Sequence, residues 1–480
     1  MKKKSDQSSR RKFLRNASVL GAGIMIVPRH VIGCGYIAPS DRLNIAGIGV
    51  GGKGAYNLEM AFKSGAANIV ALCDVDDRQA VDARKKYDKA SYHKDFRELL
   101  EGAKAKEIDA VIISTPDHMH AVQALPFMQL GKHVYVEKPL THDIYEARVL
   151  TQAAAKYKVV TQMGNQGSSG DDTRKVEAWI QKGVIGDVHT VHVWTNRPVW
   201  PQGIATPTGS HTVPPEVNWD LWLGTAPYRD YNPTYLPATW RGWVDFGTGA
   251  LGDMGCHFID VPYRALKLRY PVAVECSVGR VWSGFFKEEI YTDSYPPSSK
   301  IHIQFPAREN MPPVEMIWYD GGILPKRPAE LLPDEELAEW DGGILFEGTK
   351  GKLLAGLFGR NPKLLPTSKM KDAKLPAAEK PLVKNGWDGH QAQWIEACKK
   401  GYGAYTSSPF SEAGPLTETV LMGNLAVRSF NYSETDSKGN KKFPGRKKLL
   451  WDGENMKITN FEPANQFVKR DYRKGWSLEA

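Results

Sequence analysis

The segment GTGALGDMGCHFIDVPY, residues 247–263, carries three side chains that could transfer protons or bind a metal. A helix starting near Leu251 would place Asp253, His257 and Asp260 on one face, because side chains three and four residues apart are neighbours on a helix. An imidazole can act as a general base near neutral pH, and Asp253 could orient it. The same groups could instead ligate a metal, or simply cap and pack a helix. The spacing alone leaves all three interpretations open.

Lys138 is a second candidate for chemistry, because it follows a short apolar strand expected over residues 133–136. Pro139 has no N–H and must end that strand, so Glu137 and Lys138 are presented at its carboxyl end. In an open parallel sheet, ligands collect just beyond such strand ends. A lone lysine in a loop is more often solvated, so its position alone does not decide between the two roles.

The pattern G-x-G-x-x-G stands between a strand expected over residues 44–50 and an expected helix. Glycines let the backbone approach a pyrophosphate, whose charge the start of a helix favours. Asp74 ends a second strand 20 residues after the last of these glycines, a spacing suited to a carboxylate that binds ribose hydroxyls. Asp74 would repel a 2′-phosphate, which favours NAD over NADP, although Arg78 nearby could accept that phosphate. The candidate cofactor residues of the loop are Gly49, Gly51, Gly52, Lys53 and Gly54.

Strands and helices alternate through the first third of the chain, which is typical of a parallel, doubly wound sheet. Thr115 and Pro116 follow one of the strands and would lie along a dinucleotide. His118 and His120 are expected to be structural or cofactor-side residues rather than metal ligands. The strands are expected near residues 44–50, 68–72, 110–114, 133–136 and 159–163.

A change of composition near residue 164 indicates a second domain, because Trp-rich and Pro-rich stretches replace the alternation. The expected fold class is α/β, with an N-terminal Rossmann doubly wound parallel sheet and a C-terminal α+β domain whose mostly antiparallel sheet has an open face as a substrate floor. Some tryptophans on that face would stack on sugar rings. Strands of the second sheet are expected near residues 188–194, 272–281, 300–305 and 314–319. The expected domains are 1–40 for a signal and linker, 41–163 for dinucleotide binding and 164–480 for substrate binding.

The glycine loop, the segment S-T-P-D-H-x-H-A and the tripeptide E-K-P together resemble the Gfo/Idh/MocA family of oxidoreductases, which includes glucose–fructose oxidoreductase and inositol dehydrogenase. The resemblance spans roughly residues 41–430. It implies that Lys138 contacts both nicotinamide and substrate, and that Asp253 and His257 are the substrate-binding aspartate and catalytic histidine. It thereby favours an acid–base role for His257, with no metal. The remaining cofactor-side residues expected are Thr115, Pro116, His120, Glu137 and Gln166.

The chain has 480 residues, of which 41% are hydrophobic, and a formal net charge of +9. Residues 1–33 hold eight Lys or Arg and one Asp, so the remainder carries only +2. A nucleic-acid partner is therefore not expected. Because the sequence has no run of about 18 uncharged apolar residues, a transmembrane span is not expected either.

The N-terminal residues Ser9-Arg10-Arg11-Lys12-Phe13-Leu14, followed by a weakly apolar stretch, resemble a twin-arginine export signal. A disordered basic tail is the alternative. Val31-Ile32-Gly33-Cys34 resembles a lipobox, which leaves lipid anchoring at Cys34 open. The expected location is periplasmic or envelope-associated. The other four cysteines form no C-x-x-C pair and are expected to be buried free thiols.

These patterns predict an exported NAD(P)-dependent oxidoreductase that transfers a hydride between a carbohydrate or polyol hydroxyl and a tightly held cofactor, NAD rather than NADP. Free NAD is scarce outside the cytoplasm, so the cofactor would be carried out bound and regenerated in place. One alternative is an NAD-dependent glycosidase or lyase-type enzyme that oxidises the sugar transiently. The other is an exported sugar-binding protein without chemistry. The resemblance also implies a homo-oligomer.

Overall fold

The computed structural model describes residues 41–478, and the residues from Leu43 onward form one compact unit. The twin-arginine pattern and Cys34 lie outside the described residues. Within the described part, none of the helices combines the length and the apolar character that crossing a bilayer requires.

The first sheet has six parallel strands in the order β3-β2-β1-β4-β5-β6. This order is that of a doubly wound dinucleotide-binding fold, so the predicted Rossmann sheet is confirmed. Its central strands are buried on both faces, which explains their nearly continuous apolar sequences. The strands are β1 (Leu43–Ile48), β2 (Ala67–Cys73), β3 (Ser91–His93), β4 (Ala110–Ile113), β5 (His133–Glu137) and β6 (Thr161–Gly164).

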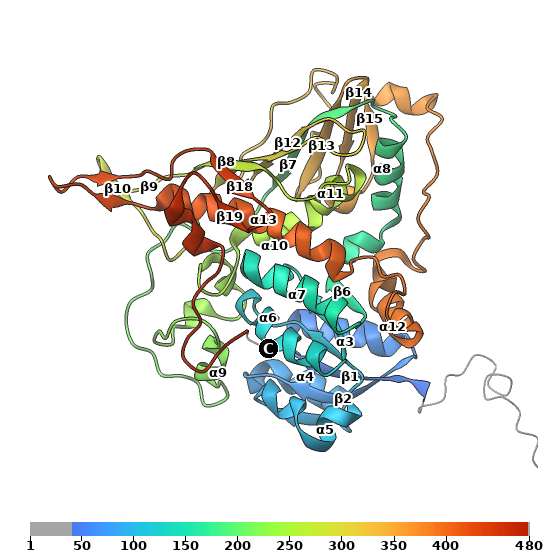
Figure 1. Cartoon of the computed structure of the whole chain (residues 1–480), viewed down its shortest axis with the longest axis vertical. Coiled ribbons are helices and arrows are strands. Elements are labelled where there is room, and N and C mark those ends of the chain that lie inside the picture. Colours follow the sequence, from blue (N-terminus) through green and yellow to red (C-terminus); the bar gives the residue numbers. More distant parts are fainter. Residues whose placement is uncertain (1–40, 479–480) are drawn as a thin grey trace, which may run out of the picture. The chain divides into compact units, whose positions relative to one another are not determined.

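Helices connect these strands, and Figure 1 shows them with the first sheet in the lower half of the view. The segment Phe96–Leu100 is a 3-10 helix, η3, and an α-helix begins only after it. The helices are α3 (Gly52–Lys63), α4 (Asp77–Lys86), α5 (Gly102–Glu107), α6 (His120–Gln129) and α7 (Ile144–Lys156).

The second sheet has nine strands in the order β15-β14-β13-β7-β12-β11-β8-β18-β19. All its neighbouring strands are antiparallel except β7 and β12, so the predicted mostly antiparallel sheet is confirmed. The strands are β7 (Val188–Thr195), β8 (Ala273–Val278), β11 (Ser299–Phe305), β12 (Val314–Tyr319), β13 (Gly342–Gly348), β14 (Gly351–Ala355), β15 (Lys363–Leu365), β18 (Leu449–Asp452) and β19 (Lys457–Ile458).

The strand expected over residues 272–281 is divided, which corrects the prediction. β8 ends at Val278, and after a break β9 (Val281–Gly284) pairs with β10 (Lys287–Glu289) instead of with the large sheet. Gly279 still donates its N–H to Ser298 O at 2.8 Å, one step beyond the pair Val278 and Ser299, and the chain leaves β11 after it. The resulting hairpin projects at the left of Figure 1.

One hydrophobic core runs through both sheets without interruption and includes residues of β1, β4 and β5 together with β11, β12 and β13. The helix α13 (Phe410–Asn431) joins the two parts, because it packs against α7 of the first domain and against α10 (Gly249–Phe258) and β8 of the second. Its buried side chains lie on all sides, as expected of a helix inside a core. The remaining helices of the second domain are α8 (Asp171–Gln181), α9 (Trp219–Leu223), α11 (Asp260–Ala265) and α12 (His390–Lys400).

A second, smaller core is built almost entirely from aromatic rings in residues 217–246, here called the Trp-rich segment. Trp219 and Trp222 stack with their centroids 4.8 Å apart, and Trp222 meets Phe246 edge-on at 4.8 Å. Asn218 donates its N–H to Val75 O at 2.8 Å, just beyond the end of β2. The Trp-rich segment therefore lies against the carboxyl end of the first sheet, where a cofactor is expected.

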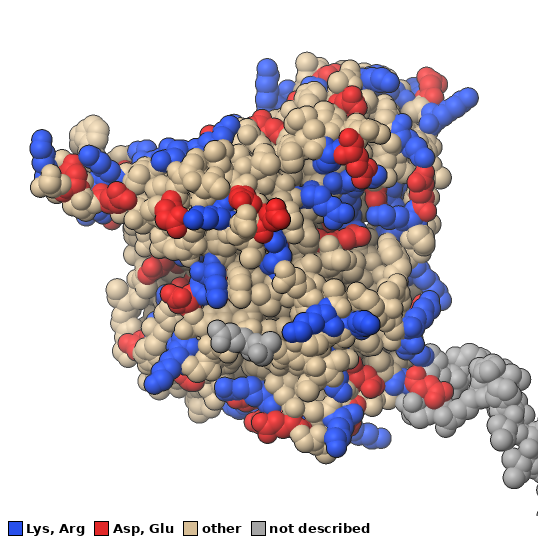
Figure 2. Space-filling model, in the orientation of Figure 1, with Lys and Arg blue, Asp and Glu red and all other residues tan. Residues whose placement is uncertain are grey.

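Acidic and basic side chains are interspersed over the face of the molecule shown in Figure 2. This mixture agrees with the small net charge of the sequence after residue 33.

Candidate active site

A cavity of about 1040 Å³ lies between the carboxyl end of the first sheet, helix α10 and the Trp-rich segment. Its size suits a dinucleotide and a small second ligand. Of the residues singled out from the sequence, those that line it are Gly49, Gly51, Gly52, Lys53, Asp74, Thr115, Pro116, Glu137, Lys138, Gln166 and His257.

The glycine loop leaves no room for side chains at two of its positions. Gly49 has φ +74°, and a Cβ there would lie 2.7 Å from Ser114 O. A Cβ on Gly54 would lie 1.8 Å from Gly49 O, so this glycine lets the first turn of α3 pack on the loop without itself lining the cavity. The backbone thus presents the N-terminus of α3 to the cavity, which favours a phosphate there.

Asp74 ends β2 and fixes the loop from the other side. Its carboxylate accepts hydrogen bonds from Val50 N at 2.9 Å and from Asp76 N at 3.0 Å. Burial raises the pKa of Asp74 to about 6 despite these bonds. Arg78, the residue that left NADP open, is held by Asp76 through Nε at 2.8 Å and Nη2 at 2.7 Å. Its charge is therefore already paired.

Lys138 meets Asp253 across the two domains. Its Nζ donates to Asp253 Oδ1 and to Asp253 O, both at 2.7 Å. An ammonium has three N–H bonds, so one remains for a ligand. Arg241 Nε also donates to Asp253 Oδ1, at 3.0 Å. Burial alone would raise the pKa of Asp253, but Lys138 and Arg241 outweigh it and hold that pKa well below its ordinary value.

His257 is oriented by Asn165, which corrects the expectation that Asp253 does so. His257 Nδ1 lies 2.8 Å from Asn165 Oδ1. The Asn165 amide nitrogen donates to Cys256 O at 2.8 Å and to Ser168 Oγ at 3.1 Å, so its oxygen must face the imidazole. Since an amide oxygen can only accept, Nδ1 carries the proton and Nε2 is the free basic nitrogen.

The surroundings of His257 keep the ring neutral. Burial and the positive charge of Lys138 lower the pKa of His257 well below its ordinary value. The ring of Phe358 meets it edge-on, with centroids 4.9 Å apart. Phe358 has the left-handed conformation, with φ +59°, which is rare for a bulky residue and concentrates at functional sites. A neutral imidazole shielded by an aromatic ring can accept a proton from a bound hydroxyl.

Asp260, the third member of the expected helix face, points elsewhere. Its carboxylate accepts from Arg264 Nε at 2.7 Å and from Ser168 Oγ at 2.8 Å. It therefore supports the Asn165 loop from behind. Within the described residues, no group of three or more His, Cys, Asp or Glu side chains could hold a metal ion.

Glu137 and Gln166 frame the cavity near Lys53. Glu137 Oε1 accepts from Asn57 Nδ2 at 2.8 Å. With its amide oriented to suit its neighbours, Gln166 accepts from Lys53 Nζ at 3.2 Å and from the Tyr135 hydroxyl at 3.0 Å. Burial lowers the pKa of Lys53, more than the nearby Glu137 raises it.

His120 supports the site from beneath and is absent from the cavity lining. Its ring nitrogens lie 2.8 Å from Pro139 O and 2.9 Å from Thr115 O, so the ring ties the loop after β4 to the loop after β5. The His118 ring is buried too, with its nitrogens 3.3 Å from Phe246 O and 3.1 Å from Trp222 O, and burial lowers its pKa to about 3.

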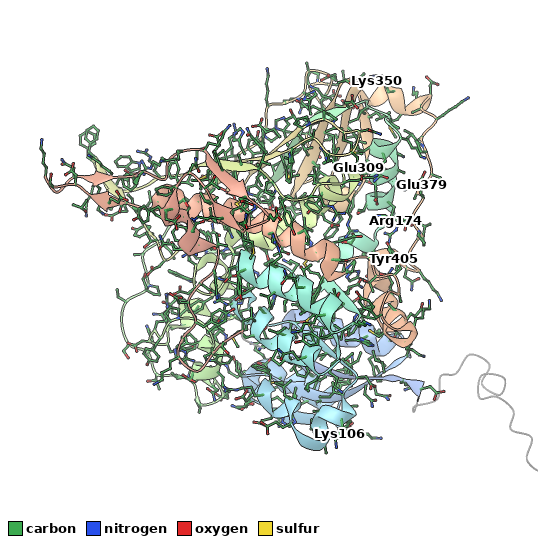
Figure 3. All side chains as sticks on the ribbon, in the orientation of Figure 1. Lys106, Arg174, Glu309, Lys350, Glu379 and Tyr405 are labelled. Atoms are coloured by element: carbon green, nitrogen blue, oxygen red, sulfur yellow. The ribbon has the colours of Figure 1, made fainter. Side chains whose placement is uncertain are left out.

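The loop that carries Asn165 and Gln166 is held by Arg174 of α8. Arg174 Nη1 donates to Ser168 O at 2.9 Å, and its Nη2 donates to Ser407 Oγ at 3.1 Å. Figure 3 labels Arg174 and Tyr405 close to each other, and their side chains lie 3.4 Å apart. The buried guanidinium therefore joins the site's loop to the segment before α13.

Both domains match models of one family. Residues 43–165 match the model described as "Oxidoreductase family, NAD-binding Rossmann fold", and residues 172–279 match "Oxidoreductase family, C-terminal alpha/beta domain". Residues 43–165 and 172–279 are thus regions of the Gfo/Idh/MocA oxidoreductase type. The first domain of the chain is accordingly an NAD-binding Rossmann domain.

Curated relatives of this chain include proteins named "Glycosyl hydrolase family 109 protein 1" and "Glycosyl hydrolase family 109 protein". The protein from Shewanella sp. strain ANA-3 is 31% identical over 205 residues, which are 37% of this chain and 44% of the relative. The protein from Solibacter usitatus is 30% identical over 154 residues, which are 29% of this chain and 35% of the relative. The matches thus span less than half the length of these curated relatives.

Solved structures share the fold of this chain at low sequence identity. Levoglucosan dehydrogenase in complex with NADH and L-sorbose superposes with a TM-score of 0.53 at 16% identity, over 81% of this chain and 96% of that one. The WlbA dehydrogenase from Bordetella pertussis, in complex with NADH and UDP-GlcNAcA, has a TM-score of 0.54 at 16% identity, over 81% of this chain and 97% of that one.

Sequence reasoning missed several residues of this site. Asn165 and Arg241 act through partners distant in sequence, and Phe358 comes from a turn after β14. Trp222 and Trp240 line the cavity from the Trp-rich segment. The lining includes no residue of the second sheet, and the expected substrate floor on the open face of that sheet stays a prediction.

Proposed function

We propose that this chain is an NAD-dependent oxidoreductase that transfers a hydride between a carbohydrate or polyol hydroxyl and its nicotinamide cofactor. The observation that carries the proposal is that Lys138 of the first domain and His257 of the second line one cavity together with the glycine loop. The nicotinamide, when bound, supplies the hydride acceptor or donor.

The residues present fit a dinucleotide. The two crowded glycines, Gly49 and Gly54, and the start of α3 suit the pyrophosphate. Asp74 suits a ribose, and the pairing of Arg78 with Asp76 removes the free cation that a 2′-phosphate would need. These features support NAD over NADP.

Proton transfer falls to His257. Its Nε2 would accept the proton of the substrate hydroxyl while Asn165 holds Nδ1. A positioned general base contributes about 10²–10⁴ in rate. The third N–H of Lys138 would hold the same oxygen as negative charge develops on it, and such a donor is worth about 10²–10³ in kcat. Asp253 keeps the Lys138 ammonium in place through two hydrogen bonds.

A carbohydrate fits against the wall of the cavity that Trp222, Tyr231 and Trp240 of the Trp-rich segment line. Flat aromatic faces suit the C–H faces of sugar rings, and Arg241 offers hydrogen-bond donors beside them. The ligands named for the structural relatives, L-sorbose and UDP-GlcNAcA, support a sugar-like substrate.

The test compares His257→Ala and Lys138→Met with the control His189→Ala, which changes an exposed histidine of β7. Purified protein would be mixed with NAD and a panel of sugars and polyols, and NADH would be followed by absorbance. We expect a fall in kcat of at least about 100-fold for both site variants, with NAD still bound, and no change for the control. Full activity in both site variants would refute the roles of His257 and Lys138, whereas a wild-type protein that produces neither NADH nor any altered sugar would favour a sugar-binding protein without chemistry.

A second candidate is an NAD-dependent glycosidase or lyase-type enzyme, which the names of the curated relatives favour. Oxidising a ring hydroxyl acidifies the neighbouring C–H, so His257 and Lys138 would serve the same steps before the hydride returns. Chromogenic glycosides distinguish the two candidates. Release of the aglycone without net NADH supports the glycosidase, whereas stoichiometric NADH without aglycone supports the dehydrogenase.

We further propose export by the twin-arginine route, supported by the residues Ser9-Arg10-Arg11-Lys12-Phe13-Leu14. Replacing Arg10 and Arg11 with lysine should leave the protein in the cytoplasm, which cell fractionation would detect. The intact mass of the exported protein would show whether Cys34 carries lipid, and light scattering would test the homo-oligomer.

A further inference from the structure

The last described residues, 468–478, here called the C-terminal tail, cross from the second domain to the first. Figure 1 shows this red segment passing α9 on its way to the first domain. Tyr145 N, at the start of α7, donates to Val468 O at 3.1 Å, which marks the arrival of the tail. From there the tail follows the carboxyl end of the first sheet.

The tail is anchored first by a buried ion pair. Arg470 Nη2 donates to Glu146 Oε1 at 2.7 Å and to His118 O at 2.6 Å, and the Tyr472 hydroxyl donates to the same Glu146 oxygen at 2.5 Å. Glu146 is fully buried in the first turn of α7, where it also completes a capping box with Asp143. Removing Arg470 would leave Glu146 charged and unpaired inside the protein, which is costly. The anchor is therefore a built part of the fold.

A second anchor ties the tail to the Trp-rich segment. Arg473 donates through Nε to Gly224 O at 3.0 Å and through Nη2 to Asp220 O at 2.8 Å, and its guanidinium also pairs with the Asp220 carboxylate. Its backbone N–H donates to Thr225 O at 3.1 Å. These partners belong to α9 and its end, and α9 itself contributes Leu221 and Trp222 to the cavity lining.

The tail then places an indole ring at one end of the cavity. Trp476 stacks on Phe96 of the segment after β3, with centroids 6.3 Å apart and planes at 29°. The guanidinium of Arg97 lies 5.0 Å from the same ring. Trp476 and Phe96 both line the cavity, next to Lys94 and Asp95.

In a Rossmann fold, the adenosine part of the dinucleotide binds at this end of the cavity. The carboxylate at the end of β2, Asp74, marks the adenosine ribose, and Phe96 follows the neighbouring outer strand β3. The catalytic candidate Lys138 follows β5, which lies on the opposite side of β1 from β2 and β3 in the strand order. His257 is near the end of α10. A purine base offers a π-face that aromatic rings bind by stacking.

We propose that the C-terminal tail is part of the NAD site: Trp476 with Phe96 forms the wall against the adenine, and the anchors at Arg470 and Arg473 keep that wall closed so that bound NAD is retained. The inference rests on NAD binding by the first domain and adds residues that come from the far end of the chain. A retained cofactor would serve many turnovers if a second carbohydrate, or the oxidised sugar itself, took the hydride back from the bound NADH in each cycle.

The experiment measures binding and release of nucleotides by the full chain carrying Trp476→Ala, with Trp282→Ala as the control. Trp282 is a half-exposed tryptophan on β9, away from the cavity. Calorimetry would give Kd for NAD, for AMP and for nicotinamide mononucleotide, and rapid desalting followed by chromatography would give the rate at which bound NAD is lost.

We expect Trp476→Ala to raise Kd for NAD and AMP about tenfold and to speed NAD loss about as much, while Kd for the mononucleotide stays unchanged. Arg473→Ala, which keeps the indole but removes its anchor, should also speed NAD loss. Unchanged AMP affinity and unchanged NAD loss in both variants would overturn the inference. If Trp476→Ala does not fold, two other variants test the inference. Trp476→Phe keeps an aromatic ring and should retain most AMP affinity, and Arg473→Ala should still speed NAD loss. A wild-type protein that binds no NAD would instead refute the proposed function.

Discussion

Asn165 offers the sharpest test of how the candidate base is prepared. Its amide is fully buried and makes three hydrogen bonds, to His257 Nδ1, to Cys256 O and to Ser168 Oγ. Asn165→Asp keeps an oxygen acceptor opposite Nδ1 and therefore keeps the same tautomer of His257. It also adds a negative charge beside the ring, which stabilises the imidazolium and must raise the pKa of His257.

The size of that shift follows from the short contact. Two unit charges about 4 Å apart attract by about 4 kcal/mol at an effective dielectric constant of about 20, equivalent to about 3 pKa units. The new carboxylate would itself be buried, which offsets part of this gain. We therefore expect the pKa of His257 to rise by about one to three units. Since only neutral His257 can accept a proton, the acid limb of kcat/KM should move to higher pH by the same amount.

The assay is the pH profile of kcat/KM for the wild type, Asn165→Asp and Asn165→Ala on the best substrate found. Asn165→Ala removes the oxygen that fixes the tautomer of His257, without adding a charge. Its kcat should fall about 10–100-fold with little movement of the acid limb, since a wrong tautomer costs up to about 10⁴ in a catalytic triad. Asn424→Asp, which buries a carboxylate without touching His257, controls for lost stability. Superimposable profiles of the wild type and Asn165→Asp would refute the argument.

Three further perturbations test other parts of the site. Asp253→Asn breaks a partly buried ion pair with two cations and should lower the free energy of unfolding by about 1–2 kcal/mol in urea titrations, where an unchanged midpoint would contradict the pairing. Gly54→Ala forces a Cβ to within 1.8 Å of Gly49 O and should weaken NAD binding at least about tenfold by calorimetry, whereas the control Gly284→Ala, whose Cβ would meet nothing closer than 3.8 Å, should not. Burial lowers the pKa of His390 to about 3, from an ordinary value of 6.5. Below pH 6.5 the unfolded chain therefore binds a proton at His390 that the folded protein does not bind, and the free energy of unfolding decreases as the pH decreases. His390→Gln removes this proton-binding site, so between about pH 6.5 and pH 5 the variant should lose about 1.5 kcal/mol less of its free energy of unfolding than the wild type. If the two proteins lost stability in parallel, His390 would not be buried in its neutral form.

Local sequence patterns were sufficient to predict much of the fold. The alternation of apolar strands and helices identified the parallel sheet, because each strand buried on both faces must be almost wholly apolar. The glycine loop could be recognised with its function, because the positive φ angles of Gly49 and Gly52 and the close approach of Gly54 to Gly49 O arise within six consecutive residues. Eleven of the residues chosen from the sequence line one cavity.

Long-range pairings could not be predicted in this way. Helical spacing correctly put Asp253 and His257 on one helix, yet the carboxylate turns to Lys138 because an ammonium attracts it more strongly than a neutral imidazole does. Asn165 comes 92 residues before His257, and no local pattern connects the two. Trp476 reaches the cavity only because the tail is anchored at α7 and α9.

The unbroken core described above limits how this molecule can move. Enzymes with two separately packed domains often admit ligands by a hinge, but α13 is buried against both sheets here, and a closely packed interior resists such an opening. Ligand entry must then depend on surface segments, the Trp-rich segment and the C-terminal tail, which are joined to each other at Asp220. Heating should accordingly unfold the two domains in one calorimetric transition. Amide hydrogen exchange should be fastest in the Trp-rich segment and the C-terminal tail.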